Sequence, residues 1–267
     1  MGDQSARIDS TGEQETSSTR PEPVRDAYGI SNSFLCSEDQ DLWSQLHPSN
    51  VAVGTHKELE SLRKKLKEDY GMKDQLWKLL KRFLQGHDQE HVVNKDFLSF
   101  HGFIAVTKWF GSFKRMKKGN TCYCLQQVEN LMKKGGVKRG KSFVSWFAGF
   151  ITNDEAYKYL RKEKCGTFLV RFSESLSSEG GFCVAVKLKD DEVLQYQIKG
   201  DYEQACNGER YNANLRLNSE LKEARDIGPC TNIVEFVDAL RCGVDIEGDF
   251  ETFCPGLPLN ATFQGYS

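Results

Sequence analysis

The sequence lacks any apolar run long enough to cross a bilayer, and its first residues carry no apolar signal segment. We therefore expect no membrane partner and a cytoplasmic protein, with the nucleus as the alternative location. The nine cysteines form no tightly spaced framework, so free thiols are expected rather than disulfides. Cys122 and Cys124 have no second pair or histidines at ligand spacing, which argues against zinc. We expect neither a metal nor a cofactor.

Signatures of common enzyme classes are missing as well. The chain has no kinase glycine loop with its lysine and no Gly-x-Ser-x-Gly elbow. Its five histidines all precede Trp146, at positions 47, 56, 87, 91 and 101. We therefore expect that the protein is not an enzyme.

The remaining composition suits a globular chain. A length of 267 residues with 39% apolar and 11% aromatic residues can hold one large or two small domains. The net charge of −2 hides an uneven distribution, because residues 108–141 contain ten Lys or Arg and one acid, Glu129. Such a run is more often a solvated helical face than a nucleic-acid site.

The first half of the chain divides into a polar arm and a helical region. Residues 1–40 are rich in Ser, Thr, Glu, Asp and Gly, so they are predicted to be a disordered arm. From about residue 50 to 141, apolar residues recur at helical spacing between glycines. The pattern is set by Leu59, Leu62, Leu66, Leu76, Leu79, Leu80, Phe83, Phe97, Phe100, Ile104, Trp109, Phe113, Leu125, Val128 and Leu131. We expect residues 50–141 to be all-helical.

Residues 85–96 partly resemble a calcium loop, because Val92 and Asp96 mimic the late positions of a helix-loop-helix site. The early ligand positions hold Gln85, His87 and Gln89. Too few carboxylates remain for a hard cation, so no calcium binding is expected.

The second half has a different pattern. Thr152 and Glu155 form a capping box that opens a helix through Leu160. Strands are predicted at residues 167–172, 182–187 and 193–198, separated by turn signals. Thr231 or Asn232 caps a last helix. The predicted fold class is α+β: an all-helical N-terminal region, then an antiparallel sheet flanked by two helices over residues 142–259, and a tail over 260–267.

One strand carries an arginine among apolar residues. In the run GTFLVRFSE of residues 166–174, alternation places Phe168, Val170 and Phe172 on one face and Arg171 on the other. A guanidinium partly removed from water cannot lose its proton, so it needs an anion. The hydroxyls of Ser173 and Ser175 follow directly and are available to the same anion. This combination predicts a phosphate pocket; the alternative is an internal ion pair with Asp154 or Glu155.

These residues make the second half similar to a known family. The runs WFAGFI (146–151), GTFLVRFSES (166–175), GFCVAV (181–186) and YQI (196–198) resemble a Src-homology-2 (SH2) domain, in order and at proper spacing. The phenylalanine after Arg171, followed by Ser-Glu-Ser, looks most like the domain of the STAT family. STAT proteins place a helical, EF-hand-like linker before this domain, and residues 91–118 are loosely similar to it. The resemblance thus makes 50–141 a linker-like, degenerate EF-hand-like domain.

The resemblance implies that the pocket binds phosphotyrosine. Arg171 matches the arginine that grips the phosphate, Ser173 and Ser175 would donate hydroxyl bonds, and the loop amides from Glu174 onward would form an anion nest. The chain departs from many relatives at three positions: Asn153 replaces Arg or Lys, Gln195 replaces histidine, and Gln197 replaces lysine. Each missing charge-assisted bond is expected to cost about 1.5–3 kcal/mol of binding.

The resulting functional hypothesis is a non-catalytic signalling adaptor that binds a tyrosine-phosphorylated protein or peptide. The alternative is a STAT-like transcription regulator, or a nucleic-acid binder that uses the basic region 108–141. The 267 residues leave no room for the long coiled coil and DNA-binding domain of STAT proteins. A homodimer formed through phosphorylated Tyr266 is left open.

Overall fold

The structure is a computed structural model in which residues 36–47, 56–86, 96–117, 119–139, 142–173, 175–176, 180–189, 192–201, 214–218, 230–242 and 250–260 are described. All of them belong to one compact unit, Ser33–Ser267. Most of the predicted arm and the tail beyond Asn260, including Tyr266, lie outside the described residues.

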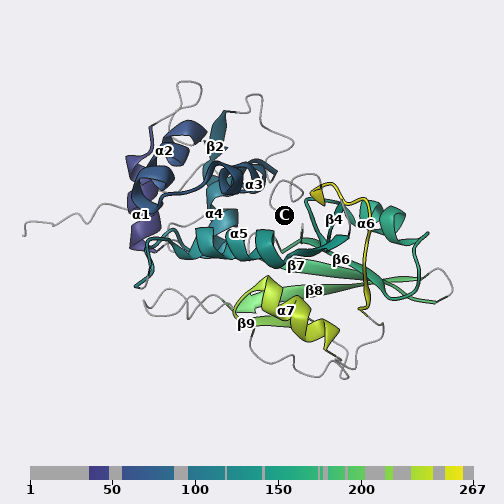
Figure 1. The fold of residues 1–267 in the computed structure, drawn as a ribbon. Helices are drawn as coiled ribbons and strands as arrows, with labels where there is room; N and C mark the ends of the chain where they lie inside the picture. The colour runs from purple at the N-terminus through teal and green to yellow at the C-terminus, as the bar shows by residue number, and fades with distance from the viewer. Residues whose placement is uncertain are drawn as a thin grey trace, which may run out of the picture. The chain divides into compact units, whose positions relative to one another are not determined.

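The first part of this unit is mainly helical (Figure 1). Its elements are α1 (Ser37–Gln45), β1 (His56–Glu58), α2 (Leu59–Tyr70), α3 (Asp74–Gly86), β2 (Phe97–Ser99), α4 (Phe100–Phe110) and α5 (Tyr123–Lys134). The short strands β1 and β2 pair antiparallel, and each leads directly into a helix. Helical periodicity gave no sign of these strands, because three residues are too few to show an alternation.

Helix α1 begins inside the segment that composition assigned to the disordered arm. Asp39 explains the difference: it is 2% exposed, and its Oδ1 accepts a hydrogen bond from the Phe113 backbone N–H at 2.7 Å. The Cys36 thiol donates to the other carboxylate oxygen at 3.2 Å. The buried Asp39 carboxylate thus attaches α1 to the backbone at Phe113 by a hydrogen bond. Composition alone does not indicate such a contact.

The segment that partly resembles a calcium loop, residues 85–96, runs from the end of α3 to the residue before β2. Its described residues are Gln85 and Gly86 at the end of α3, and Asp96, whose carboxylate lies 3.8 Å from Lys81 Nζ. Residues 87–95 lie outside the described part of the chain. The absence of calcium binding therefore stays a prediction.

The second part of the unit contains a hairpin and a larger sheet. After the hairpin β3 (Gly136–Arg139) and β4 (Ser142–Ser145) come β5 (Phe147–Gly149), α6 (Asn153–Leu160), β6 (Thr167–Phe172), β7 (Phe182–Lys187), β8 (Val193–Asp201), β9 (Asn214–Asn218), α7 (Ile233–Arg241) and β10 (Thr252–Phe253). Strands β6 to β9 are antiparallel neighbours, which confirms the predicted meander. Both β5 and β10 pair with β6 in parallel, an addition that the sequence did not predict.

The two helices of the sheet region begin at the predicted caps. Thr152 and Glu155 form the capping box, with each side chain accepting the other residue's backbone N–H. Asn232 is the cap of α7, because its Oδ1 accepts from the Glu235 N–H at 3.0 Å. Figure 1 shows α6 and α7 on opposite sides of the strands, as the predicted fold class requires.

Phe172 links the helical part to the sheet. Its ring centroid lies within 6.0 Å of the rings of six aromatic residues: Phe83, Trp109, Phe110, Phe147, Phe150 and Phe182. Three of these come from α3 and α4 and the others from the sheet region. The aromatic side chains that sequence periodicity assigned to helix packing thus cover one face of β6.

Candidate functional site

The candidate site starts from the position of Arg171 on β6. All six residues of this strand are buried, so β6 is covered on both faces. Phe172 pairs with Phe182 and Arg171 pairs with Cys183 on the neighbouring strand. Because side chains alternate, the aromatic face and the arginine face are opposite sides of the same sheet. On the arginine side, Leu169 and Ala185 pack with Ala156 and Leu160 of α6.

The Arg171 guanidinium is held by neutral oxygens. Its Nη1 donates to the Phe172 carbonyl at 3.0 Å and to the Ile151 carbonyl at 3.5 Å. Its Nη2 donates to Asn153 Oδ1 and, at 3.1 Å, to Gln195 Oε1. Its Nε is buried and has no hydrogen-bond partner among the described residues. The site therefore holds a cation that is 4% exposed and whose hydrogen-bond partners carry no charge.

The internal ion pair considered as the alternative does not form. Glu155 is occupied by the helix cap, where its carboxylate accepts the Thr152 N–H at 2.8 Å. Asp154 is exposed. Among the described residues, no carboxylate lies within ion-pair distance of Arg171. The charge of the guanidinium is thus not neutralised by an acid of the described chain.

The predicted hydroxyls form a second group on the same side. Ser173 Oγ lies 3.3 Å from Ser175 Oγ, and Gln197 Nε2 donates to Ser175 Oγ at 3.1 Å. Gln197 also pairs with Cys183 across β7 and β8, so this group adjoins the guanidinium. Glu174 lies outside the described residues. We call Arg171, Asn153, Gln195, Ser173, Ser175, Gln197 and Cys183 the Arg171 cluster.

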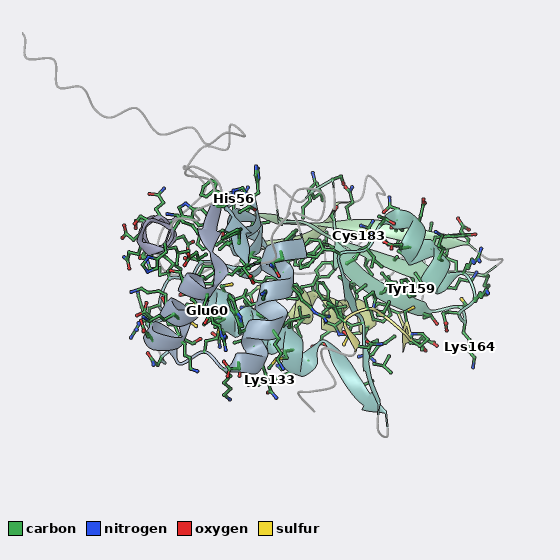
Figure 2. The ribbon with its side chains drawn as sticks, turned by 90° about the horizontal axis from the view of Figure 1, so that it is seen from above. His56, Glu60, Lys133, Tyr159, Lys164 and Cys183 are labelled. Carbon is green, nitrogen blue, oxygen red and sulfur yellow. The ribbon has the colours of Figure 1, made fainter. Side chains whose placement is uncertain are left out.

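Cys183 is the member of this cluster that the motifs did not single out. It is labelled in Figure 2, and its Sγ lies 3.6 Å from Gln195 Oε1. Burial raises the pKa of the Cys183 thiol, while the neighbouring Arg171 charge acts in the opposite direction. The sequence signal was present, since antiparallel pairing of the two predicted strands places residue 183 opposite residue 171.

Three other basic residues of the SH2-like region lie away from the guanidinium. Lys158 and Arg161 are exposed on and just after α6. Lys187 shares the face of Cys183 but is four residues further along β7, roughly 13 Å away at about 3.3 Å per residue. Arg171 is therefore the cation at the centre of the cluster.

The basic run 108–141 is partly engaged within the protein. Lys114 pairs with Glu38 at 2.8 Å, and Lys133 pairs with Glu129 at 2.8 Å. Arg115 donates to the Asp69 carbonyl at 2.6 Å. The interpretation of this run as a solvated helical face rather than a nucleic-acid site stays a prediction.

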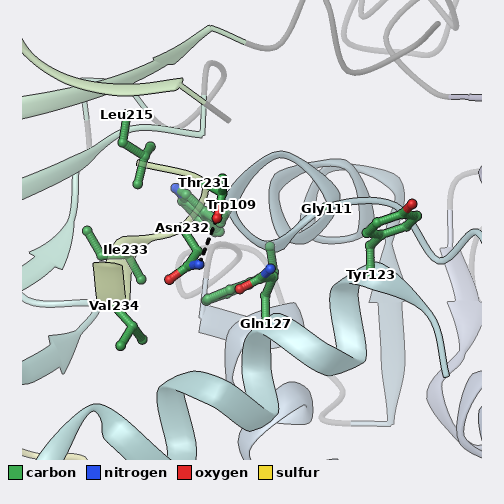
Figure 3. A pocket seen from close by; sticks show the side chains of 10 residues that line it. Trp109, Gly111, Tyr123, Gln127, Leu215, Thr231, Asn232, Ile233 and Val234 are labelled. Atoms are coloured by element: carbon green, nitrogen blue, oxygen red, sulfur yellow. Dashed lines mark hydrogen bonds between the residues drawn. The ribbon is translucent and has the colours of Figure 1, made fainter. Parts of the chain in front are cut away.

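A separate pocket lies between the helical part and the end of the sheet (Figure 3). Its walls come from α4 and α5, including Trp109 and Gln127, and from Leu215, Thr231 and Asn232 before α7. The Gln127 Oε1 atom is buried without a described hydrogen-bond partner. No lining residue belongs to the Arg171 cluster, so this pocket and the cluster are separate sites.

The described part of the chain offers neither a membrane span nor a metal cluster. No helix there is both long and apolar enough to cross a membrane. No group of three or more His, Cys, Asp or Glu side chains comes together there in a way that would hold a metal ion.

Several solved structures are similar to parts of this chain. The SH2 domain of a CRK/CRKL homolog from Monosiga brevicollis is 18% identical, with 40% of this chain and 83% of that chain covered and a TM-score of 0.30. An inactive choanoflagellate E3 ubiquitin ligase Cbl TKB is 13% identical over 67% of this chain and 49% of that one, with a TM-score of 0.40. The SH2 domain of human proto-oncogene protein VAV1 is 17% identical, with 40% of this chain and 68% of that chain covered and a TM-score of 0.27.

Curated protein sequences give no match to the chain. The family model of the SH2 domain matches residues 146–219, a segment that contains the Arg171 cluster. The match is to the SH2 domain in general, so the likeness to STAT proteins stays a prediction. SH2 domains are non-catalytic modules that bind tyrosine-phosphorylated peptides. Residues 146–219 of this chain therefore form an SH2 domain.

Proposed function

We propose that the protein is a non-catalytic signalling adaptor that binds phosphotyrosine peptides through Arg171, Ser173 and Ser175. The SH2 domain supports a phosphotyrosine-binding role in signalling. The adaptor assignment and the individual residues are the proposal. One observation carries it: a buried guanidinium on the arginine face of the central strand has only neutral hydrogen-bond partners among the described residues.

The positive charge of Arg171 has no anionic partner among the described residues. A buried cation is costly unless an anion or a full set of hydrogen bonds accompanies it. Among the described residues, Arg171 has four neutral acceptors for its terminal nitrogens and none for Nε. A phosphate dianion supplies both the missing charge and acceptors for the planar fork of the guanidinium. Ligand binding would therefore stabilise this part of the sheet.

The neighbouring amides would change their role when phosphate binds. In the structure, Asn153 and Gln195 present oxygen atoms to the guanidinium. Half a turn of an amide about its last bond replaces the oxygen with an NH2 donor, which suits a phosphate oxygen. Ser173 and Ser175 already lie 3.3 Å apart, so their hydroxyls are placed to donate to one anion. We propose that the cluster closes on phosphate by turning these amides.

The depth of Arg171 favours phosphotyrosine over phosphoserine. The guanidinium is 4% exposed and is covered from one side by Asn153 at the start of α6. A phosphate on a short serine side chain has little reach below the surface of a peptide backbone. An aromatic stem carries the phosphate further, toward the strand. Selectivity is thus expected to follow from reach rather than from recognition of the ring.

The test measures binding of a degenerate phosphotyrosine peptide pool to the full chain by fluorescence polarisation. Arg171→Lys keeps the charge and removes the fork, so affinity is expected to fall about 10- to 100-fold. Arg161→Lys, the same exchange at an exposed arginine next to α6, is the matched control and should bind as the unsubstituted protein does. Equal affinities for the two variants, or equal binding of the unphosphorylated pool, would contradict the proposal.

The nucleic-acid alternative has a different experimental signature. Binding through the basic run 108–141 would weaken steeply with added salt, by roughly one power of salt concentration for each phosphate contacted. The internal ion pairs of Lys114 and Lys133 make this outcome less favoured. Retention of the chain on duplex DNA with such a salt dependence would support it.

A further inference from the structure

We propose that Trp109, on α4, is a positioning residue for the loop that carries Ser173 and Ser175. This inference rests on the proposed function, because it assigns a role in phosphate binding to the helical part of the chain. Trp109 itself would not touch the ligand. It would act by fixing the base of the loop between β6 and β7, whose described residues are Ser173, Ser175, Leu176, Gly180 and Gly181.

The base of this loop is closed by the two backbone groups of Gly181. Its carbonyl accepts the Ser173 N–H at 3.0 Å, and its N–H donates to the Leu176 carbonyl at 2.9 Å. Ser173 is thereby held at the point where the loop leaves β6. The orientation of the Gly181 carbonyl therefore helps to fix the position of the Ser173 backbone, and with it the position of the Ser173 hydroxyl.

Trp109 occupies the second acceptor position of the same carbonyl. Its indole Nε1–H donates to Gly181 O at 3.0 Å, a bond that is buried and spans 72 positions of sequence. A carbonyl oxygen has two lone pairs, and here one receives Ser173 and the other receives Trp109. The loop base is consequently hydrogen-bonded to the helical part of the protein and not only to the sheet.

The indole ring has little freedom to move away. Trp109 is 6% exposed, and its ring centroid lies 4.0 Å from that of Phe172 and 5.5 Å from that of Phe150. Phe172 is the residue between Arg171 and Ser173. The same tryptophan thus packs under the strand end through its ring and holds the loop base through its N–H.

Gly180 gives independent evidence that α4 and the loop are closely fitted. Its φ is +71°, and a Cβ at this position would lie 2.6 Å from the Lys108 carbonyl oxygen. Lys108 precedes Trp109 on α4. Backbone therefore meets backbone beside the indole bond, where only glycine fits. The helix end acts as a fixed wall for the loop.

The first experiment compares Trp109→Phe with Trp77→Phe in the full chain. Phenylalanine at position 109 keeps an aromatic ring beside Phe172 but removes the donor to Gly181. Trp77 is also 6% exposed and lies on α3, and it takes no part in the hydrogen bonds of the loop base. We expect Trp109→Phe to weaken binding of the phosphotyrosine peptide pool about tenfold, the effect of one buried hydrogen bond left unmade. Trp77→Phe should change it less than about twofold.

The second experiment uses glycines with the same backbone angle. Gly180 and Gly256 both have φ of +71°, but nothing lies within 4 Å of a Cβ built on Gly256. Alanine costs a similar backbone strain at both sites, and only Gly180→Ala also presses against Lys108. We expect Gly180→Ala to lose at least about tenfold in affinity and Gly256→Ala to bind as the unsubstituted chain does.

A readout that needs no ligand separates this inference from the proposed function. Hydrogen exchange of the Ser173 amide, measured by NMR, reports the bond to Gly181 directly. It should become about tenfold faster in Trp109→Phe than in Trp77→Phe, even if the protein binds no phosphopeptide. Failure of the unsubstituted chain to bind the phosphotyrosine peptide pool would overturn the proposed function. Equal Ser173 exchange in the two tryptophan variants would overturn the role of Trp109.

Discussion

Phe172 and Trp109 pack with ring centroids 4.0 Å apart, so the residue directly after Arg171 is in contact with a helix that precedes the SH2 domain. Alternation along β6 places Arg171 on one face of the sheet and Phe172 on the other. The site and the contact with the helical part are therefore adjacent in sequence and opposite in space. The two faces therefore share one strand, β6.

The aromatic contacts of Phe172 predict that the described helices and sheet unfold as one cooperative unit. Phe172→Ala should lower the free energy of unfolding by about 3–5 kcal/mol, because a ring that is 3% exposed leaves a cavity among six aromatic neighbours. Urea denaturation followed by circular dichroism measures the change. Tyr157→Ala, at a 44% exposed aromatic residue on α6, is the control and should cost less than about 0.5 kcal/mol. Two separate transitions for the unsubstituted protein would refute the shared core.

The neutral surroundings of Arg171 predict a gain of affinity from an added cation. Asn153→Arg supplies a second guanidinium beside the first, and phosphopeptide binding should tighten about tenfold and become more dependent on salt. The helix N-terminus at this position opposes a cation by about 0.3–1 kcal/mol, which limits the gain. Asp154→Asn raises the net charge by the same one unit on the same helical turn without adding a fork. Equal gains in both variants would show that net charge, not a local contact, is responsible.

Asp39 and Glu38 predict opposite dependences of stability on pH. Burial raises the pKa of Asp39 in the folded protein, so the folded state binds this proton more tightly than the unfolded state does. Its contribution to the free energy of unfolding therefore falls as pH rises from the unfolded pKa of about 3.9 through the folded pKa. Asp39→Asn should remove this fall while keeping an acceptor for the Phe113 N–H.

For Glu38 the sign is reversed. Its hydrogen bond with Lys114 lowers the pKa of Glu38 to about 2, so its contribution is present above the unfolded pKa and is lost as pH falls toward 2. Glu38→Gln should remove that acid-side loss. Thermal unfolding between about pH 2 and 7 separates the two effects. The assignment of Asp39 fails if Asp39→Asn and the unsubstituted chain keep a constant stability difference across this range.

The cysteines predict a selective pattern of alkylation. Among the described cysteines, Cys165 and Cys242 are exposed and should react first with iodoacetamide at neutral pH. Burial raises the pKa of Cys122 and of Cys254 to about 12, so their reactive thiolate forms are scarce. Peptide mapping after a short exposure measures the order. Early labelling of Cys122 or Cys254 in the folded chain would contradict the described burial.

Much of the SH2 region was predictable because its signals are local. The alternation in residues 167–172 indicated a strand with Arg171 opposite Phe172, and the structure has this strand with the same bounds. Thr152 with Glu155, and Asn232, marked helix starts through side chains that bond a backbone N–H three residues away. Such patterns depend on neighbours along the chain, which the sequence lists directly.

The remaining features depend on contacts between distant residues, and tertiary structure alone determined them. Burial of Asp39 added α1 to a segment whose composition indicated disorder, and the parallel pairing of β5 and β10 closed the edge of β6. Three of the four described neutral partners of Arg171 come from the distant positions 151, 153 and 195, and the indole bond to Gly181 spans 72 positions. No local periodicity encodes which surfaces meet, because that choice minimises exposed apolar area and unpaired polar groups over the whole chain at once. By itself, then, the sequence determined the strand and its arginine, while the fold determined what surrounds them.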